Sequence, residues 1–108
     1  MHKNHTELEI SIAEPWFSMI VNGEKKEEYR EIKPYWISRF KNVFSMYPYS
    51  AIPVGTDKHW IRLRNGYGKS RPSCLIQASL DIRRGKPEWG AEPEKEYFVL
   101  VIHDVVVC

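Results

Sequence analysis

The sequence predicts a β-rich α+β fold, a closed or nearly closed mixed barrel of about six strands with two short helices. Three observations predict it. Most of the chain consists of short apolar segments separated by glycine- and proline-containing breaks, as in strand-rich proteins. Only two segments favour a helix, and the chain lacks the strand–helix repeat of a parallel sheet. Closure of the sheet is expected because it removes exposed strand edges.

The chain of 108 residues is expected to be one domain, 1–108, in which residues 1–6 form a flexible terminus. No linker or internal repeat divides it. The predicted elements, in chain order, are a strand at 8–12, a helix at 16–22, a strand at 26–32, a helix from 34 through 40, and strands at 43–49, 59–65, 73–82 and 97–107.

The first elements follow from alternation and from helix-end signals. Leu8, Ile10 and Ile12 alternate with polar residues, which predicts a strand with one buried face. Pro15 suits the first turn of the helix that follows. Gly23 occupies the position where a left-handed residue commonly ends a helix. The chain then enters a strand of alternating charge.

The later elements are predicted in the same way. Pro34 begins the second helix, and Pro48 closes the strand at 43–49 before a loop at 50–58. In the strand at 59–65, the even-numbered residues share one face and Ile61 and Leu63 share the other. The segment at 83–94 is a surface excursion that Trp89 anchors. The last strand, 97–107, is almost continuously apolar, which predicts a central position in the sheet.

Composition excludes several classes of function. Hydrophobic residues make up 43% and charged residues 28%, as in soluble globular proteins, and no stretch approaches the ~20 apolar residues of a membrane-spanning helix. The N-terminus lacks the apolar core of a signal peptide, so a cytoplasmic location is expected. Cys74, Cys108 and the four histidines lack metal-ligand spacing, so neither a metal nor a cofactor is expected. The net charge is only +2, so binding of nucleic acid would depend on where the cations lie.

The most informative segment is Gly23–Arg30, in which charges alternate after a glycine. In a strand, Glu28 and Arg30 share one face and Tyr29 lies on the other. Lys25 falls at the junction between helix and strand. The residue types alone leave two interpretations open, a solvated surface strand or the wall of a polar site.

A second group of candidates combines cations with aromatic rings. Arg62 and Arg64 share a strand face with Trp60, and Tyr67 and Lys69 lie in the glycine-containing loop that follows. This pattern is typical of surfaces that bind single-stranded nucleic acid, where cations contact phosphates and rings stack on bases. The alternative is that Trp60 belongs to the core and the arginines keep the surface soluble.

The pattern G-x-K-x-x-E-x-R, formed by Gly23, Lys25, Glu28 and Arg30, resembles the signature of ASCH domains, small β-barrels of the PUA-like superfamily. The order of the predicted elements along most of the chain is similar too. The resemblance implies a cleft between barrel and helices that binds single-stranded RNA, a nucleotide or a nucleoside. It further implies that Lys25 and Arg30 face a phosphate or base and that Glu28 orients them.

The resemblance also implies an enzymatic alternative. One branch of the family hydrolyses N4-acetylcytidine with a lysine, a threonine and a glutamate, and other members are reported to cut RNA. Lys25 matches the lysine, whereas Glu28 stands at the threonine position. Because a carboxylate does not replace a hydroxyl nucleophile, the same reaction is not expected. The alternative function is therefore a hydrolase of RNA phosphodiesters or of a modified nucleoside, with Lys25 and Glu28 as catalytic residues. A purely structural lattice of salt bridges is the third possibility.

Overall fold

The computed structural model describes residues 8–44 and 57–107. The elements in these ranges, in chain order, are β1 (Leu8–Ile12), α1 (Trp16–Val21), β2 (Glu27–Arg30), α2 (Pro34–Phe44), β3 (His59–Asn65), β4 (Ser73–Arg84), the 3-10 helix η1 (Pro87–Trp89) and β5 (Glu96–Val107). The predicted flexible terminus 1–6 lies outside the described residues. So do residues 45–56, which contain most of the predicted strand at 43–49 and of the predicted loop at 50–58.

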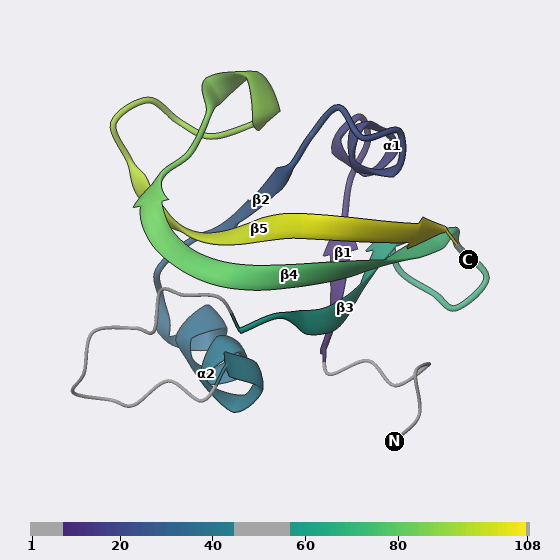
Figure 1. The fold of residues 1–108 in the computed structure, drawn as a ribbon, viewed down its shortest axis with the longest axis horizontal. Coiled ribbons are helices and arrows are strands. Elements are labelled where there is room, and N and C mark those ends of the chain that lie inside the picture. The colour runs from purple at the N-terminus through teal and green to yellow at the C-terminus, as the bar shows by residue number, and fades with distance from the viewer. Residues whose placement is uncertain (1–7, 45–56, 108) are drawn as a thin grey trace.

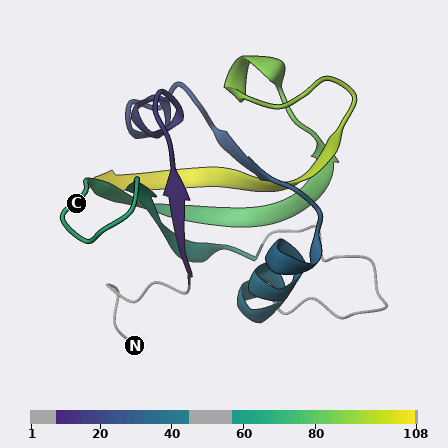
Figure 2. The same cartoon turned by 180° about the vertical axis from the view of Figure 1, so that it is seen from behind.

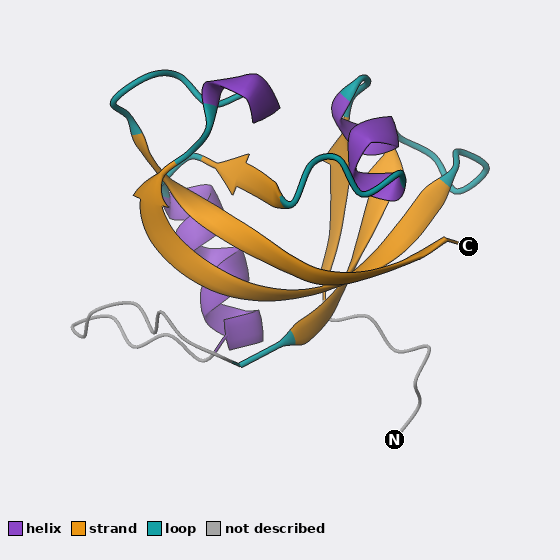
Figure 3. Ribbon diagram, turned by 45° about the horizontal axis from the view of Figure 1, so that its top comes forward, coloured by secondary structure: helices purple, strands orange, loops and turns teal. Residues whose placement is uncertain are grey.

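The described strands form one mixed sheet in the order β1-β3-β4-β5-β2. β1 is parallel to β3, and the other neighbours are antiparallel. Figures 1 and 3 show this sheet curling into a half-barrel. The β-rich α+β fold with a mixed sheet is therefore confirmed. Over the described residues, however, the sheet is an open half-barrel of five strands, with β1 and β2 as its two edges, rather than a closed barrel of six.

The predicted strand at 43–49 is wrong at its start, because Val43 and Phe44 are the last residues of α2. An apolar run of this length fits either a strand or a helix. The helix is favoured here because Phe40, Val43 and Phe44 have the i, i+3, i+4 spacing of one helical face, and all three are buried. The ring of Phe40 packs edge-on against Phe98 of β5, with 5.1 Å between the ring centroids.

Local sequence signals set both ends of α1. The carboxylate of Glu14 accepts hydrogen bonds from the backbone N–H of Ser18 at 3.0 Å and from its hydroxyl at 2.8 Å. At the other end, Gly23 has a φ of +85°, and its N–H donates to the carbonyl of Ile20 at 3.1 Å. The predicted role of Gly23 as the residue that ends the helix is confirmed. As a result the chain turns directly after the helix and presents Lys25 just before β2.

Buried side chains cover both faces of β2 and β5. The main core fills the inner side of the half-barrel and includes Ile61 and Leu63, as their alternation predicts. A smaller cluster lies on the opposite face, where Tyr29 and Val99 pack with Ala91 from the segment after η1. The predicted excursion at 83–94 begins too early, because residues 83 and 84 extend β4. The rest of that segment is a second covering layer over β2 and β5 as well as a surface excursion.

The segments α1 and η1 meet beside β2. In Figures 1 and 2 both lie above β4 and β5, with β2 running between them and α2 below β4. Gly90, which follows η1, lies against Trp16 of α1. A Cβ atom at position 90 would be 3.1 Å from the indole ring, so this close approach requires glycine. The contact places two tryptophan-bearing segments over the charged strand.

Gly85, which follows β4, offers a test of the smaller cluster. A Cβ at this position would lie 2.6 Å from the Cβ of Ala91 and 2.7 Å from the ring of Tyr29. We expect Gly85→Ala to lower the free energy of unfolding by about 1–3 kcal/mol, because the added methyl group displaces packed atoms. Urea denaturation measures the change. The control is Arg84→Ala, which removes an exposed side chain and should stay within about 0.5 kcal/mol of the wild type. Equal losses in the two variants would contradict this packing.

Candidate functional site

Lys25, Glu28 and Arg30 form a continuous chain of ion pairs. The Nζ atom of Lys25 lies 3.1 Å from Oε1 of Glu28, and Nη1 of Arg30 contacts Oε2 of the same carboxylate. Glu28 is 5% exposed, so this carboxylate is nearly removed from water. The predicted placement of Glu28 and Arg30 on one strand face is confirmed. Their proximity to Lys25 follows from the turn that Gly23 makes.

Lys25 is the most enclosed of the three residues, with 1% of its surface exposed. Its Nζ donates hydrogen bonds to the carbonyl oxygens of Glu27 and Trp89, the latter at 2.9 Å. The same atom lies 4.7 Å from the ring centroid of Tyr29 and 5.6 Å from that of Trp16. The ammonium group therefore joins α1, β2 and the end of η1.

Burial and charge act on the pKa of Lys25 in opposite directions. Burial lowers it, because a charged ammonium loses its hydration. The charge of Glu28 and its hydrogen bond raise it, but the net result is a pKa below the usual value for lysine. A lysine in this state gives up its proton more readily than a lysine on the surface.

Arg30 joins the two edges of the half-barrel. Its Nη2 donates to the carbonyl oxygen of Ser11 in β1 at 2.8 Å, and its Nη1 donates to the carbonyl oxygen of Tyr29 at 2.8 Å. The guanidinium carbon lies 5.2 Å from the ring centroid of Trp36 in α2. Because β1 and β2 are not paired in the described sheet, this side chain supplies a link at the point where the barrel is open.

The opposite face of β2 carries a separate polar network. The hydroxyl of Tyr29 donates to Oε1 of Glu27 at 2.7 Å and accepts from the backbone N–H of Lys86 at 2.9 Å. Nη2 of Arg83 lies 2.8 Å from Oε2 of Glu27. Burial favours a higher pKa for Glu27, but the hydrogen bonds from Arg83 and Tyr29 outweigh it and hold the pKa below its usual value. Burial and the neighbouring carboxylate raise the pKa of Tyr29, so its hydroxyl keeps its proton.

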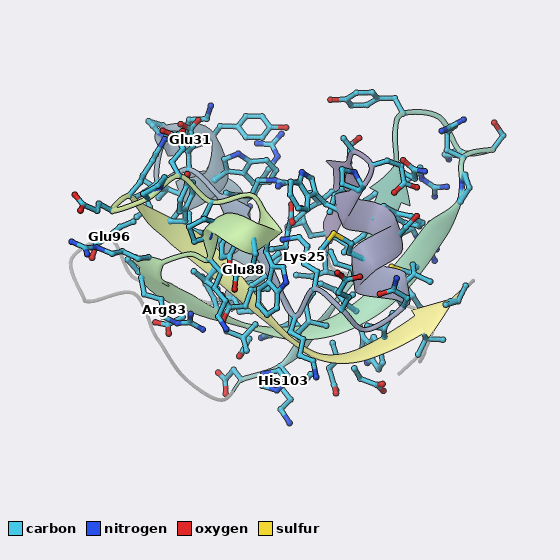
Figure 4. All side chains as sticks on the ribbon, turned by 90° about the horizontal axis from the view of Figure 1, so that it is seen from above. Lys25, Glu31, Arg83, Glu88, Glu96 and His103 are labelled. Atoms are coloured by element: carbon cyan, nitrogen blue, oxygen red, sulfur yellow. The ribbon has the colours of Figure 1, made fainter. Side chains whose placement is uncertain are left out.

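A small pocket of about 130 Å³ opens over the ion-pair chain. Its lining residues are Trp16, Glu28, Tyr29, Arg30, Trp89 and Gly90. Figure 4 shows Lys25 near the centre of the view from above, between α1 and η1. Three aromatic side chains from three elements thus surround a carboxylate that accepts hydrogen bonds and a guanidinium that donates them. Lys25 does not line the pocket and acts on it through Glu28.

The structure does not bring Trp60, Arg62 and Arg64 to this pocket. These residues alternate with buried ones along β3 and so point away from the inner side, where Glu28 lies. Nη1 of Arg62 donates to the hydroxyl of Ser73 at 2.8 Å. Arg64 binds Glu9 of β1 at 2.7 Å and, through Nη1, the carbonyl oxygens of Lys69 at 3.1 Å and Arg71 at 2.9 Å. Both arginines stabilise the outer surface of the sheet, and a role in ligand binding stays a prediction.

Tyr67 and Lys69 are exposed on the loop after β3, and Tyr67 is 90% exposed. Tyr67 lines a second groove, of about 300 Å³, together with Ser11 and Trp36. Because Arg30 contacts both Ser11 and Trp36, this groove is next to the ion-pair chain although separate from the small pocket.

The sequence did not predict Trp16, Tyr29 and Trp89 as pocket residues. Trp16 precedes the motif by one short helix, which is the only sequence signal for its position. Trp89 is predicted only as a loop anchor, and no spacing rule connects it with Trp16. The pocket forms because η1 returns to α1, and that contact depends on the tertiary fold.

No group of three or more His, Cys, Asp or Glu side chains that could hold a metal ion occurs within residues 8–44 and 57–107. In the same ranges, no helix is both long and apolar enough to span a membrane. Comparisons with protein-family models, with curated proteins and with solved structures find no match to this chain. A functional proposal therefore depends on the geometry of the site and on the motif.

The two neighbouring lysines, Lys25 and Lys26, provide a matched test of the ion-pair chain. Lys25→Met should lower the free energy of unfolding by about 3–5 kcal/mol, because it leaves the carboxylate of Glu28 buried with one partner fewer. Lys26 is exposed, so Lys26→Met should change it by about 0.5 kcal/mol or less. Chemical denaturation of both variants measures the difference. A Lys25→Met variant as stable as Lys26→Met would show that the buried pair does not stabilise the fold.

Proposed function

We propose that this protein binds RNA or a nucleotide at the cleft built on the G-x-K-x-x-E-x-R motif. One observation carries the proposal. Glu28 and Arg30, which are ion-paired to each other and through Glu28 to the buried Lys25, line a pocket together with three aromatic residues. We further propose that the half-barrel is a PUA-like fold of the ASCH type, because the motif and the order of the elements resemble that family.

The pocket's chemistry suits a nucleobase. Aromatic walls stack on the flat face of a base, and each stacked base contributes on the order of 1–3 kcal/mol. A carboxylate accepts hydrogen bonds from exocyclic amino groups, and a guanidinium donates to ring nitrogens and carbonyl oxygens. Glu28 and Arg30 supply these two functions side by side. Because Lys25 and Arg30 hold the carboxylate between them, the acceptor is oriented before a ligand arrives.

The volume of the pocket limits the size of the ligand group that it can bind. Pockets for drug-sized ligands measure roughly 300–1,000 Å³. The pocket at Glu28 measures about 130 Å³, so it fits one flat group rather than a whole nucleotide. The sugar and phosphate would then lie outside the pocket, next to Arg30. This division favours a base that projects from a strand or from a nucleotide.

Binding can be tested with two tryptophan variants. Isothermal titration with nucleosides, nucleoside monophosphates and short single-stranded RNAs should detect affinity that weakens as salt is raised. Trp89→Leu should reduce that affinity by about five-fold or more, because it removes a stacking surface in the pocket. Trp60→Leu is the control, since Trp60 lies on the other face of the sheet and should leave the affinity unchanged. No binding at low salt, or an equal effect of the two variants, would argue against the proposal.

Hydrolysis of an RNA phosphodiester or a modified nucleoside is the second candidate function. The lowered pKa of Lys25 and its ion pair with Glu28 favour it, because a buried amine that holds its proton less tightly beside a carboxylate suits acid–base chemistry. In this candidate Glu28 contacts the substrate as the general base, and Lys25 and Arg30 orient its carboxylate.

Turnover separates the two candidates. If the protein is a hydrolase, chromatography of RNA or modified nucleosides incubated with it should show products. Glu28→Gln should then reduce the rate by about 100-fold or more, because the amide cannot transfer the proton. Circular dichroism checks that the variant is folded. A wild-type protein that binds these ligands without product formation would rule out hydrolysis of them and leave the binding function.

A further inference from the structure

The second groove has walls of a different kind from the small pocket. It lies between α2, β1 and the loop after β3, and it measures about 300 Å³. Tyr35, Trp36 and Arg39 line it from α2, and Tyr67 lines it from the loop. Three aromatic rings and a guanidinium thus face one space that is more than twice the volume of the small pocket.

Two of these rings are available for stacking. Tyr67 is 90% exposed and Tyr35 is 51% exposed. Tyr67 stands between Gly66 and Gly68, whose φ values of +95° and +100° form a tight turn that projects its side chain. The guanidinium carbon of Arg39 lies 3.5 Å from the centroid of Tyr35, so the two groups are stacked. A stacked arginine has a second planar face on which a base can pack.

The charges around the groove favour an anion. Glu9 is its acidic lining residue, and Nε of Arg64 holds that carboxylate at 2.7 Å. The hydrogen bond from Arg64, with the charges of Arg64, Arg62 and Lys69, lowers the pKa of Glu9. The negative charge of Glu9 is therefore compensated by neighbouring cations, and Arg39 adds a positive charge to the lining of the groove.

Arg30 connects the groove with the small pocket. It lines the pocket, and it contacts Ser11 and Trp36, which line the groove. One guanidinium therefore contacts the lining of both cavities. A strand that places one base in the pocket can pass its phosphate beside Arg30 and continue into the groove.

We propose that the groove is a base-stacking subsite for single-stranded RNA, in which the nucleotides next to the pocket-bound base stack on Tyr67, Tyr35 and Arg39. The inference rests on the proposed function and narrows it, because the preferred ligand becomes a strand rather than a free nucleotide. An acidic peptide would pair with the cations at the groove but would leave the exposed faces of the tyrosine rings unused, so RNA fits the groove better.

Fluorescence anisotropy with a series from a labelled mononucleotide to hexauridylate and hexaadenylate tests the subsite. The hexanucleotides should bind more tightly than the mononucleotide, by about five-fold or more for each additional stacked base. Tyr67→Ala should reduce the ratio of hexanucleotide to mononucleotide affinity by about five-fold or more, and Tyr67→Phe should retain it, because the ring remains. Arg39→Ala should reduce the same ratio, whereas Arg84→Ala, which removes an exposed arginine from the end of β4, should not.

The outcomes separate the two proposals. Wild-type protein that binds neither mononucleotide nor hexanucleotide overturns both. Equal affinity along the length series, or a ratio unchanged in Tyr67→Ala, overturns the subsite and leaves binding at the pocket standing. A poly-glutamate competitor completes the test. If it binds as tightly as hexauridylate and loses affinity equally in Tyr67→Ala, the groove is a surface for acidic peptides and the RNA assignment fails.

Discussion

The buried carboxylate of Glu28 is the group on which the arrangement of the site depends. Each of its two oxygens contacts one cation, Lys25 or Arg30. The carboxylate and Lys25 are both almost fully buried, so solvent cannot readily substitute for a partner that is removed. Each cation then hydrogen-bonds a distant segment. Lys25 donates a hydrogen bond to the carbonyl oxygen of Trp89, the last residue of η1, and Arg30 donates one to the carbonyl oxygen of Ser11 in β1. Because an uncompensated buried charge is costly, all of these contacts form together or are lost together.

This dependence connects stability with the proposed function. Arg30 of the ion-pair chain links β1 with β2, which are not paired in the described sheet, and the pocket and the groove both lie beside this side chain. A ligand meets groups that are already oriented, so little conformational entropy is lost when it binds. Arg30 has a particular position in this arrangement. It supports the open edge of the half-barrel and also contacts the lining of both cavities, so a phosphate beside it would contact a side chain that the fold already holds in place.

Strand alternation and helix-end signals predicted most of the local structure, because they depend on residues close in sequence. The bounds of β3 match the predicted 59–65, and Gly23 ends α1 as expected. The prediction failed at Val43 and Phe44, where a short apolar run fits a strand as well as the face of a helix. Closure of the barrel was also predicted from a general rule about exposed edges. In the described residues, a side chain and not a strand spans the gap between β1 and β2.

For the site, the sequence by itself determined that Glu28 and Arg30 share a strand face and that Lys25 precedes the strand, since a turn and a strand face are local features; the contact between Lys25 and Glu28 comes from the structure. The sequence also separated Arg62 and Arg64 from Ile61 and Leu63 by alternation. Only the tertiary structure decided that Trp16 and Trp89 wall the pocket, and that Tyr67 joins Tyr35 and Trp36 at the groove. These residues are far apart along the chain, and the contacts arise from the curl of the sheet and the return of η1 to α1. Periodicity describes which way a side chain points, whereas long-range packing determines what it meets there.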